Sequence, residues 1–300
     1  MPSPRAHPAA FLLAPVLALS APALAQQTNP EQNGGWYRWE GGPPKLWSLS
    51  VEPKFFYVAP SGDVKLPGTR SNGNDISLTD LNVDDPDIAF FGEIHIRKDR
   101  WRVSASGFTL NVEGDAFLEQ DETFGDAVGF AGETVRTRLD FTTFELLGSY
   151  RFAEYAGSQS YDGVYKTVAG LEVIGGVRYY DVDLEIDVDL ATRDTIFLLP
   201  SEASGDRIFV HPVVGIRGDV EFYEQWAIEV ESTVGGFFAG DHSSYSWDIK
   251  AQFTWRPTEH IGAFVGYRQL AFHLEDGDSP GKFEWDGALA GLFFGAQIRF

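Results

Sequence analysis

Apolar and polar residues alternate with a period of two through most of the chain after residue 45. In residues 247–256 the odd positions hold Trp, Ile, Ala, Phe and Trp, whereas the even positions hold Asp, Lys, Gln, Thr and Arg. Side chains of a β-strand point alternately to its two faces, so this pattern predicts strands with one apolar and one polar face. We predict ten such strands, over residues 46–60, 87–98, 101–115, 134–152, 166–188, 207–222, 225–240, 244–256, 260–275 and 285–300.

The connections between these segments alternate in length. Tight turns are predicted at 98–100, 223–224 and 256–259, and long connections at 61–86, 116–133 and 189–206. A short link at 241–243 and a long one at 153–165 depart from the alternation. Short periplasmic turns and longer external loops are typical of transmembrane β-barrels. We therefore predict an all-β fold, a single antiparallel up-and-down barrel over residues 46–300 with about ten strands, within a range of roughly eight to twelve.

The N-terminus has the pattern of a secretory signal. Arg5 and His7 precede an apolar run over residues 9–19, and small residues lead to Ala23-Leu24-Ala25 before Gln26. The run is shorter than the ~20 residues that a spanning helix requires, so cleavage is favoured over an uncleaved anchor. We expect residues 1–25 to be a signal peptide, residues 26–45 to be an N-terminal periplasmic segment, and the mature protein to reside in the outer membrane.

Aromatic residues fall at two levels of the predicted strands. Aromatic rings with a polar tip favour the membrane–water boundary. One set lies at the ends near the tight turns and includes Trp47, Trp101, Tyr150, Phe152, Trp226, Trp255 and Phe300. A second set is assigned to the outer boundary and includes Tyr57, Tyr179, Phe237, Trp247 and Trp285. The alternation by itself also fits a soluble sandwich or a lipocalin-like barrel, in which the apolar face would point inward.

The polar faces would line the lumen if the apolar faces contact lipid. The predicted lumenal residues are Glu52, Lys54, Glu93, His95, Arg97, Arg102, Glu145, Arg151, Glu172, Arg178, His211, Arg217, Asp219, Glu229, Glu231, Lys250, Arg256, Arg268 and Arg299. Unpaired charges in a narrow lumen are costly, so these residues are expected to form a polar network that plugs the barrel. A narrow conducting path lined by the same residues is the alternative.

Charge is distributed unevenly along the chain. The net charge is −21, and residues 61–87, 113–133, 181–206 and 275–286 hold 26 of the 44 acidic residues but only four basic ones. The excess negative charge is therefore predicted on the external side, and it opposes nucleic-acid binding. Five carboxylates alternate along one strand face at Asp181, Asp183, Glu185, Asp187 and Asp189. Their mutual repulsion requires either full solvation or a bound divalent cation, Ca²⁺ or Mg²⁺; no other cofactor is expected.

The whole mature chain resembles bacterial outer-membrane β-barrel proteins. The resemblance rests on the signal peptide, on strands such as residues 262–268, and on the C-terminal Gln297-Ile298-Arg299-Phe300. In such proteins a terminal Phe with alternating apolar residues, here Phe300 and Ile298, is the signal read by the barrel-assembly machinery. The resemblance implies that machinery, periplasmic chaperones and outer-membrane lipids as partners. No cysteine is present, so no disulfide supports the fold.

Enzymatic constellations known in such barrels are matched poorly. The strand count resembles omptin-type proteases, and Asp84-Asp85 and Asp241-His242 lie in predicted external loops, but the Asp and His of that family are separated by one residue. His242 and Ser244 have the H-x-S spacing of lipid A deacylases without that family's surrounding residues. We therefore predict a non-enzymatic barrel with acidic external loops and a structural or adhesive role. A narrow porin-like channel is the alternative and a hydrolase the third reading.

Overall fold

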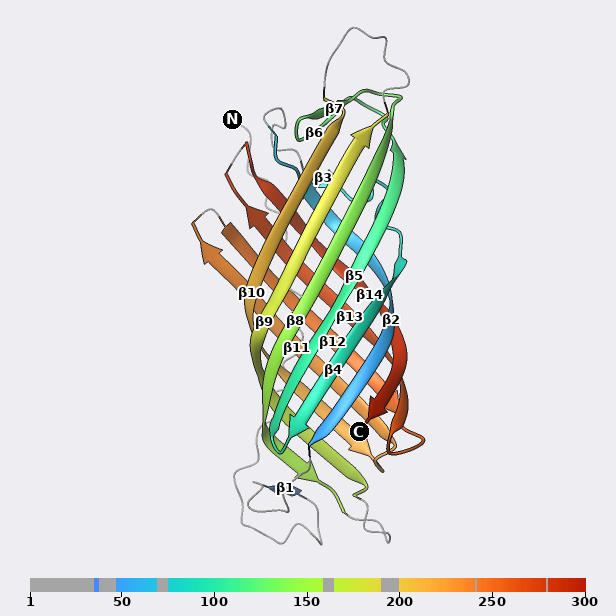
Figure 1. Cartoon of the computed structure of the whole chain (residues 1–300), viewed down its shortest axis with the longest axis vertical. Coiled ribbons are helices and arrows are strands. Elements are labelled where there is room, and N and C mark those ends of the chain that lie inside the picture. Colours follow the sequence, from blue (N-terminus) through green and yellow to red (C-terminus); the bar gives the residue numbers. More distant parts are fainter. Residues whose placement is uncertain are drawn as a thin grey trace, which may run out of the picture.

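Ten long antiparallel strands close into a barrel in the computed structural model, as the alternation predicts. The structure describes residues 35–37, 47–68, 75–158, 165–189, 200–240, 242–278 and 280–300. The barrel strands are β2 (Ser48–Lys65), β4 (Asp87–Lys98), β5 (Trp101–Phe117), β8 (Thr134–Ala156), β9 (Thr167–Val188), β10 (Glu202–Phe222), β11 (Trp226–Ala239), β12 (His242–Trp255), β13 (Ile261–Asp276) and β14 (Phe283–Arg299). Each pairs with the next, and β14 pairs with β2 to close the ring (Figure 1).

The N-terminal predictions lie almost wholly outside the described residues. This holds for the signal peptide and for the segment 26–45, except for β1 (Gly35–Tyr37), which pairs with the lower end of β8. Within the described part of the chain, no helix is long and apolar enough to cross a membrane.

The tight turns form one end of the barrel, the periplasmic end in this architecture. Asp99, Tyr223 and Glu224 have positive φ angles of 53°, 50° and 61°. Tyr223 and Glu224 are the two central residues of one turn, and positive φ at both matches the right-handed twist of the flanking strands, which lets that hairpin close within a few residues. The C-terminus lies at this end, where Phe300 N donates to Leu49 O at 2.9 Å (Figure 1).

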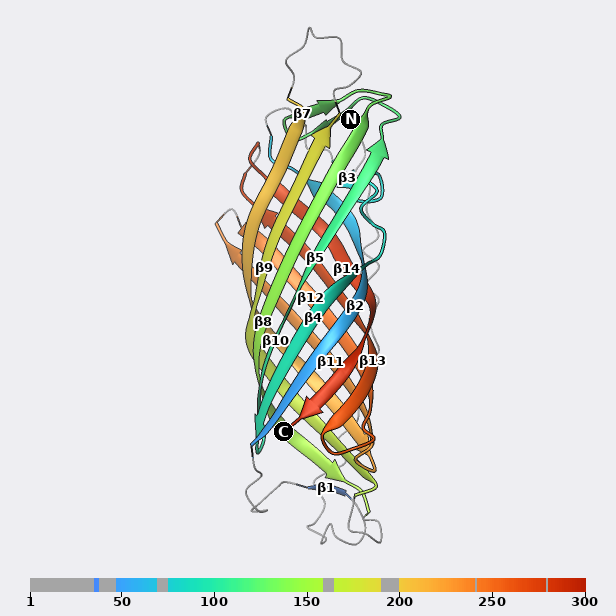
Figure 2. The same cartoon turned by 45° about the vertical axis from the view of Figure 1, so that its right-hand side comes forward.

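The opposite end of the barrel is cut obliquely. Strands β8, β9 and β10 are 23, 22 and 21 residues long, whereas β4, β11 and β12 have 12, 14 and 14. The long strands and β5 therefore rise above the rest as a tall wall on one side (Figures 1 and 2). A transmembrane strand needs only ~9–11 residues, so about half of each long strand extends beyond the membrane.

The polarity of the two faces reverses along these long strands. Below Thr142 and Thr143, β8 turns Phe144 and Leu146 outward and buries Glu145 inside. Above that point β8 exposes Arg136 and Arg138 on the outside and buries Val135, Leu139 and Phe141 inside. The barrel consequently has a lower tier with a polar interior and an apolar exterior, and an upper tier with the reverse arrangement.

The upper tier contains a continuous apolar core. Phe141 packs against Phe108, Tyr180, Phe272 and Trp285, with ring centroids 5.7–6.0 Å apart. The external segments fold inward onto this core near β3 (Ile76–Ser77) and near the hairpin of β6 (Glu122–Phe124) and β7 (Ala127–Gly129). They contribute the buried side chains of Leu66, Ile76, Leu78, Leu81, Val83, Leu118, Phe124 and Ala127.

Three sequence expectations require correction here. The interior is not polar throughout, because the strands outgrow the membrane and the upper tier must bury apolar side chains inward, away from water. Trp285 belongs to this core, fully buried, and not to the outer aromatic boundary. On β14 the lipid-facing positions are even-numbered, so an odd-numbered residue points inside. The strands β2 and β10 also extend further into the predicted loops than expected, to Lys65 and from Glu202.

Candidate functional site

The lower tier is filled by an ion-pair network centred on Glu172. The Glu172 carboxylate accepts hydrogen bonds from Arg97 (2.7 Å), Arg102 (3.2 Å), Arg151 (3.1 Å) and Arg217 (3.1 Å), and from the Ser149 hydroxyl (2.8 Å). These donors come from β4, β5, β8 and β10, so one β9 side chain ties together strands from around the barrel. Glu172 is only 1 % exposed.

Two further clusters continue the network toward the apolar core. Glu93 accepts from Lys54 (2.5 Å) and Lys250 (2.9 Å). Higher up, Arg178 and Arg268 share the carboxylates of Glu145 and Asp248, with Arg178 and Arg268 lying 2.8 Å and 2.7 Å from Asp248. Lys54 also lies 5.1 Å from the ring centroids of Phe91, Phe264 and Phe293, which joins the network to the aromatic core above it.

Interlinked charges of both signs make the interior a plug. Buried charges are stable only when they are paired and hydrogen-bonded, and removal of one partner leaves another charge uncompensated. Lys54, Arg178, Arg217 and Arg268 are each no more than 2 % exposed. The arrangement therefore fixes strand positions across the lower lumen. It leaves these side chains little freedom to move apart and open a water-filled path.

All nineteen residues assigned to the lumen from the sequence lie on the interior face. Most are buried; His95, Arg97, Glu229, Arg256 and Arg299 are half-buried. His211 accepts or donates at Ser244 (2.8 Å) and Ser246 (3.1 Å) and packs edge-on against Tyr180. Its surroundings are thus those of a satisfied core histidine.

A carboxylate–histidine group in the lumen has the composition of a metal site. Ligand atoms of Glu52, Glu93 and His95 lie within 4.8 Å of one another. The Lys54 ammonium, however, lies 3.1 Å from Glu52 and 2.5 Å from Glu93. A cation already occupies the position between the two carboxylates, so a metal ion would have to displace a buried, paired lysine.

The exterior of the tall wall is strongly acidic. We call its outward-facing charged residues the acidic wall: Glu113, Asp115, Arg136, Arg138, Asp140, Asp181, Asp183, Glu185, Asp187, Glu202 and Asp206. Partial burial, followed by repulsion from Glu185, Asp206, Asp140 and Asp181, raises the pKa of the Asp183 carboxyl. The wall therefore carries carboxylates in mutual repulsion on rigid strands.

The four strand carboxylates predicted as cation ligands lie on this wall, and Asp189 follows the end of β9. In the described part of the chain, their oxygens form no group of three ligand atoms within 4.8 Å. Consecutive side chains on one strand face are too far apart to converge on one small ion. The spacing suits a solvated, extended surface better than a preformed Ca²⁺ site.

The residues considered for catalysis are dispersed. Asp84 accepts a hydrogen bond from the Thr79 hydroxyl (2.9 Å). His242, at the rim on β12, has Asp276 as its partner at 2.5 Å, and Asp241 lies outside the described residues. Ser244 faces the lumen, where its hydroxyl is 2.8 Å from His211.

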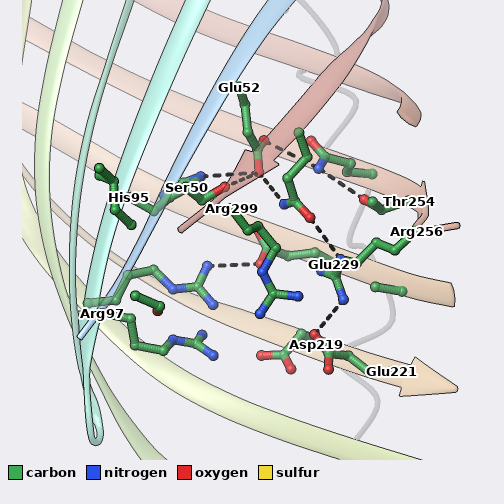
Figure 3. A pocket seen from close by; sticks show the side chains of 16 residues that line it. Ser50, Glu52, His95, Arg97, Asp219, Glu221, Glu229, Thr254, Arg256 and Arg299 are labelled. Atoms are coloured by element: carbon green, nitrogen blue, oxygen red, sulfur yellow. Dashed lines mark hydrogen bonds and ion pairs between the residues drawn. The ribbon is translucent and has the colours of Figure 1, made fainter. Parts of the chain in front are cut away.

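A polar pocket opens at the periplasmic end of the lumen, and no motif in the sequence predicts it. Its volume is about 110 Å³. The lining includes Glu52, His95, Arg97, Arg102, Asp219, Glu221, Glu229, Arg256, Gln297 and Arg299 (Figure 3).

The outside of the lower tier forms a lipid-facing band of exposed aromatic and apolar residues. Trp47, Trp101, Trp226 and Trp255 are exposed at the periplasmic level, together with half-buried Tyr150. Trp226 and Trp255 stack on neighbouring strands with centroids 6.0 Å apart. Above them apolar side chains are exposed on the outside, among them Val103, Leu146, Val173, Ile216 and Val265, as in the band that a transmembrane barrel presents to lipid.

No protein-family model and no curated protein matches the sequence. Among solved structures, the outer membrane protease OmpT from Escherichia coli is similar at a TM-score of 0.51 and 10 % identity, covering 87 % of this chain and 99 % of that one. The chain has the fold of an outer-membrane β-barrel protein. Ail of Yersinia pestis and the toluene transporter TodX of Pseudomonas putida also match, both at a TM-score of 0.29, with 9 % and 10 % identity. They cover 84 % of this barrel and 99 % and 90 % of their own chains; at such values they add nothing to the fold assignment.

Proposed function

We propose that this protein is a closed, non-enzymatic barrel that presents the acidic wall outside the membrane in a structural or adhesive role. The main support for this proposal is that the interior is filled, whereas the exterior of the tall wall carries charges on regular strands. The lower lumen is occupied by buried ion pairs and the upper lumen by an aromatic core. An interior of this kind supports a scaffold better than it supports a solute pathway.

The acidic wall is well placed for contact with a partner. At ~3.4 Å per residue and a strand tilt of ~40°, the nine residues 134–142 of β8 raise it roughly 20 Å above the lipid-facing band. It carries nine carboxylates and two guanidinium groups on four adjacent strands. Strand backbones hold these charges in place, so a positively charged surface would meet them without first ordering a loop.

Conductance separates the scaffold from a channel. Refolded protein in planar bilayers is expected to give no steady openings. Openings whose ion selectivity changes on Arg217→Ala would overturn the proposal and favour a narrow channel. For a plugged lumen the same substitution should lower stability without producing current, since Arg217 pairs with Glu172, Glu229 and Glu231.

Adhesion tests the wall itself. Cells that display the protein are expected to bind a polylysine-coated surface, more weakly as salt rises, because exposed charges are screened over ~10 Å at 0.1 M salt. Neutralising Asp181, Asp183, Glu185 and Asp187 together should reduce this binding. The control neutralises four exposed loop carboxylates, Asp80, Asp85, Glu119 and Asp278, and so changes net charge equally. Equal loss in both variants would show that total charge matters and the wall does not.

A further inference from the structure

One arginine of the periplasmic pocket has no ion-pair partner among the described residues. Each lining carboxylate already has a partner at 2.5–3.1 Å: Glu52 with Lys54 and Gln297, Asp219 with Arg151, Glu221 with Arg256, and Glu229 with Arg102. Arg97, Arg102 and Arg256 are thereby engaged, since Arg97 pairs with Glu172 at 2.7 Å. Among the residues that the structure describes, none places a carboxylate within ion-pair distance of Arg299.

The position of Arg299 is fixed by the barrel. Its backbone N–H donates to His260 O at 2.8 Å, and Arg299 is paired with Ser50 across the β14–β2 seam. Its side chain is on the interior face, half-buried, and lines the pocket, as does Ser50 (Figure 3). The barrel therefore fixes the backbone position from which this side chain enters the pocket.

We propose that Arg299 is the anchor of a binding site for a carboxylate group presented from the periplasm. A guanidinium donates two parallel hydrogen bonds to a planar carboxylate, which is the pairing that its geometry favours. The cavity of about 110 Å³ has room for such a group and some of its water. This proposal concerns the end of the barrel opposite to the acidic wall, so it stands or falls independently of the surface role.

The charges of the pocket favour an anion of low charge. Four carboxylates and four arginines line it, and Arg299 is the one of these arginines without an ion pair among the described residues. A phosphate dianion would bring an excess negative charge close to Glu52, Glu221 and Glu229, whose own charges are already balanced. Repulsion from these carboxylates would oppose it, so carboxylates are expected to bind better than phosphate.

The proposal is tested by NMR of the arginine side chains. Folded full-length protein in detergent, labelled with ¹⁵N, is titrated with acetate while the side-chain Nε–H resonances are recorded. The Arg299 resonance is expected to shift saturably, and that of exposed Arg136 is not. Arg299→Gln should weaken acetate binding by about tenfold or more, the loss expected for a charge-assisted hydrogen bond. Arg136→Gln makes the same charge change on the acidic wall and should leave the affinity unaltered.

A second arm identifies where the carboxylate comes from. Purified peptidoglycan, whose peptides carry carboxylates, is tested for retention of the protein before and after chemical amidation. Retention that is lost on amidation and in Arg299→Gln assigns the site to the cell wall; an acetate response without retention assigns it to small free carboxylates. If Arg299→Gln does not fold, the wild-type titration and Arg299→Lys decide. No acetate response at Arg299 together with no amidation-sensitive retention overturns the proposal.

Discussion

Replacing Glu172 by glutamine tests whether the ion pairs of the lower tier stabilise the folded barrel. The substitution keeps the shape of the side chain and removes the negative charge that four arginines share. Arg102 keeps Glu229, Arg151 keeps Asp219, and Arg217 keeps Glu231 after the change. Arg97 has no second ion-pair partner in the described structure, but its side chain is 30 % exposed and can turn toward water in the pocket.

These remaining contacts place the expected cost near the lower end of the range for a broken buried pair. Such breaks cost ~3–5 kcal/mol, so we expect Glu172→Gln to lower the free energy of unfolding by about 3 kcal/mol. In guanidinium this corresponds to a midpoint shift of roughly 0.5–0.8 M for a barrel of this size. The assay is reversible unfolding in lipid vesicles, followed by tryptophan fluorescence.

Glu185→Gln provides the matched control on the same strand. Glu185 is exposed on the acidic wall, and such substitutions usually change stability by less than ~0.5 kcal/mol. If Glu172→Gln unfolds at the same denaturant concentration as the wild type, the network does not stabilise the barrel and the plug argument fails. If the control loses as much as Glu172→Gln, the effect is one of net charge and not of burial.

Three further outcomes are expected. Phe141→Ala should cost ~3–5 kcal/mol in the same unfolding assay because it empties the upper core, whereas Phe144→Ala on the lipid face should cost clearly less; equal losses would contradict a packed upper tier. Ile298→Lys should reduce outer-membrane levels measured by fractionation, since a charge on the lipid face costs ~2–4 kcal/mol at mid-membrane and less near its boundary. Asp286→Lys, on the same face but above the band, should assemble normally, and parallel behaviour of the two would count against the band. The raised pKa of Asp183 means that the folded state holds its proton more tightly than the unfolded state, so wild-type stability falls as pH rises from the ordinary value of 3.8 through the raised one. Asp183→Asn should therefore be the more stable protein at neutral pH and lose this advantage below about pH 4; a pH-independent difference would refute that sign.

The period-two pattern was sufficient to predict ten strands and the interior face of every lumenal residue. A residue's face depends only on its parity within a strand, and parity is visible in the chain. The change of face chemistry near Thr142 was also visible, since residues 135, 139 and 141 are Val, Leu and Phe, whereas 145, 149 and 151 are Glu, Ser and Arg. The rule that apolar side chains face outward holds only for the part of each strand that lies in the membrane.

The pairing of lumenal charges could not be obtained from the chain. Arg102 and Glu229 are separated by 127 positions, and the closure of the barrel sets which acids face which bases. Arg299 is of the same kind: it has the sequence environment of any lumenal arginine. That no described carboxylate lies within ion-pair distance of it emerges only from the positions of the residues across the pocket.

The reversal between the tiers also fixes how deeply the protein sits in its membrane. The interior changes from polar to apolar, and the exterior from apolar to polar, at the same height, near Thr142 on β8 and Tyr179 on β9. Moving the barrel inward by one pair of residues would draw Asp181 into hydrocarbon, and moving it outward would strip lipid from Phe144. The insertion depth of the barrel is therefore fixed. A partner that binds the acidic wall binds it at a constant height above the membrane surface.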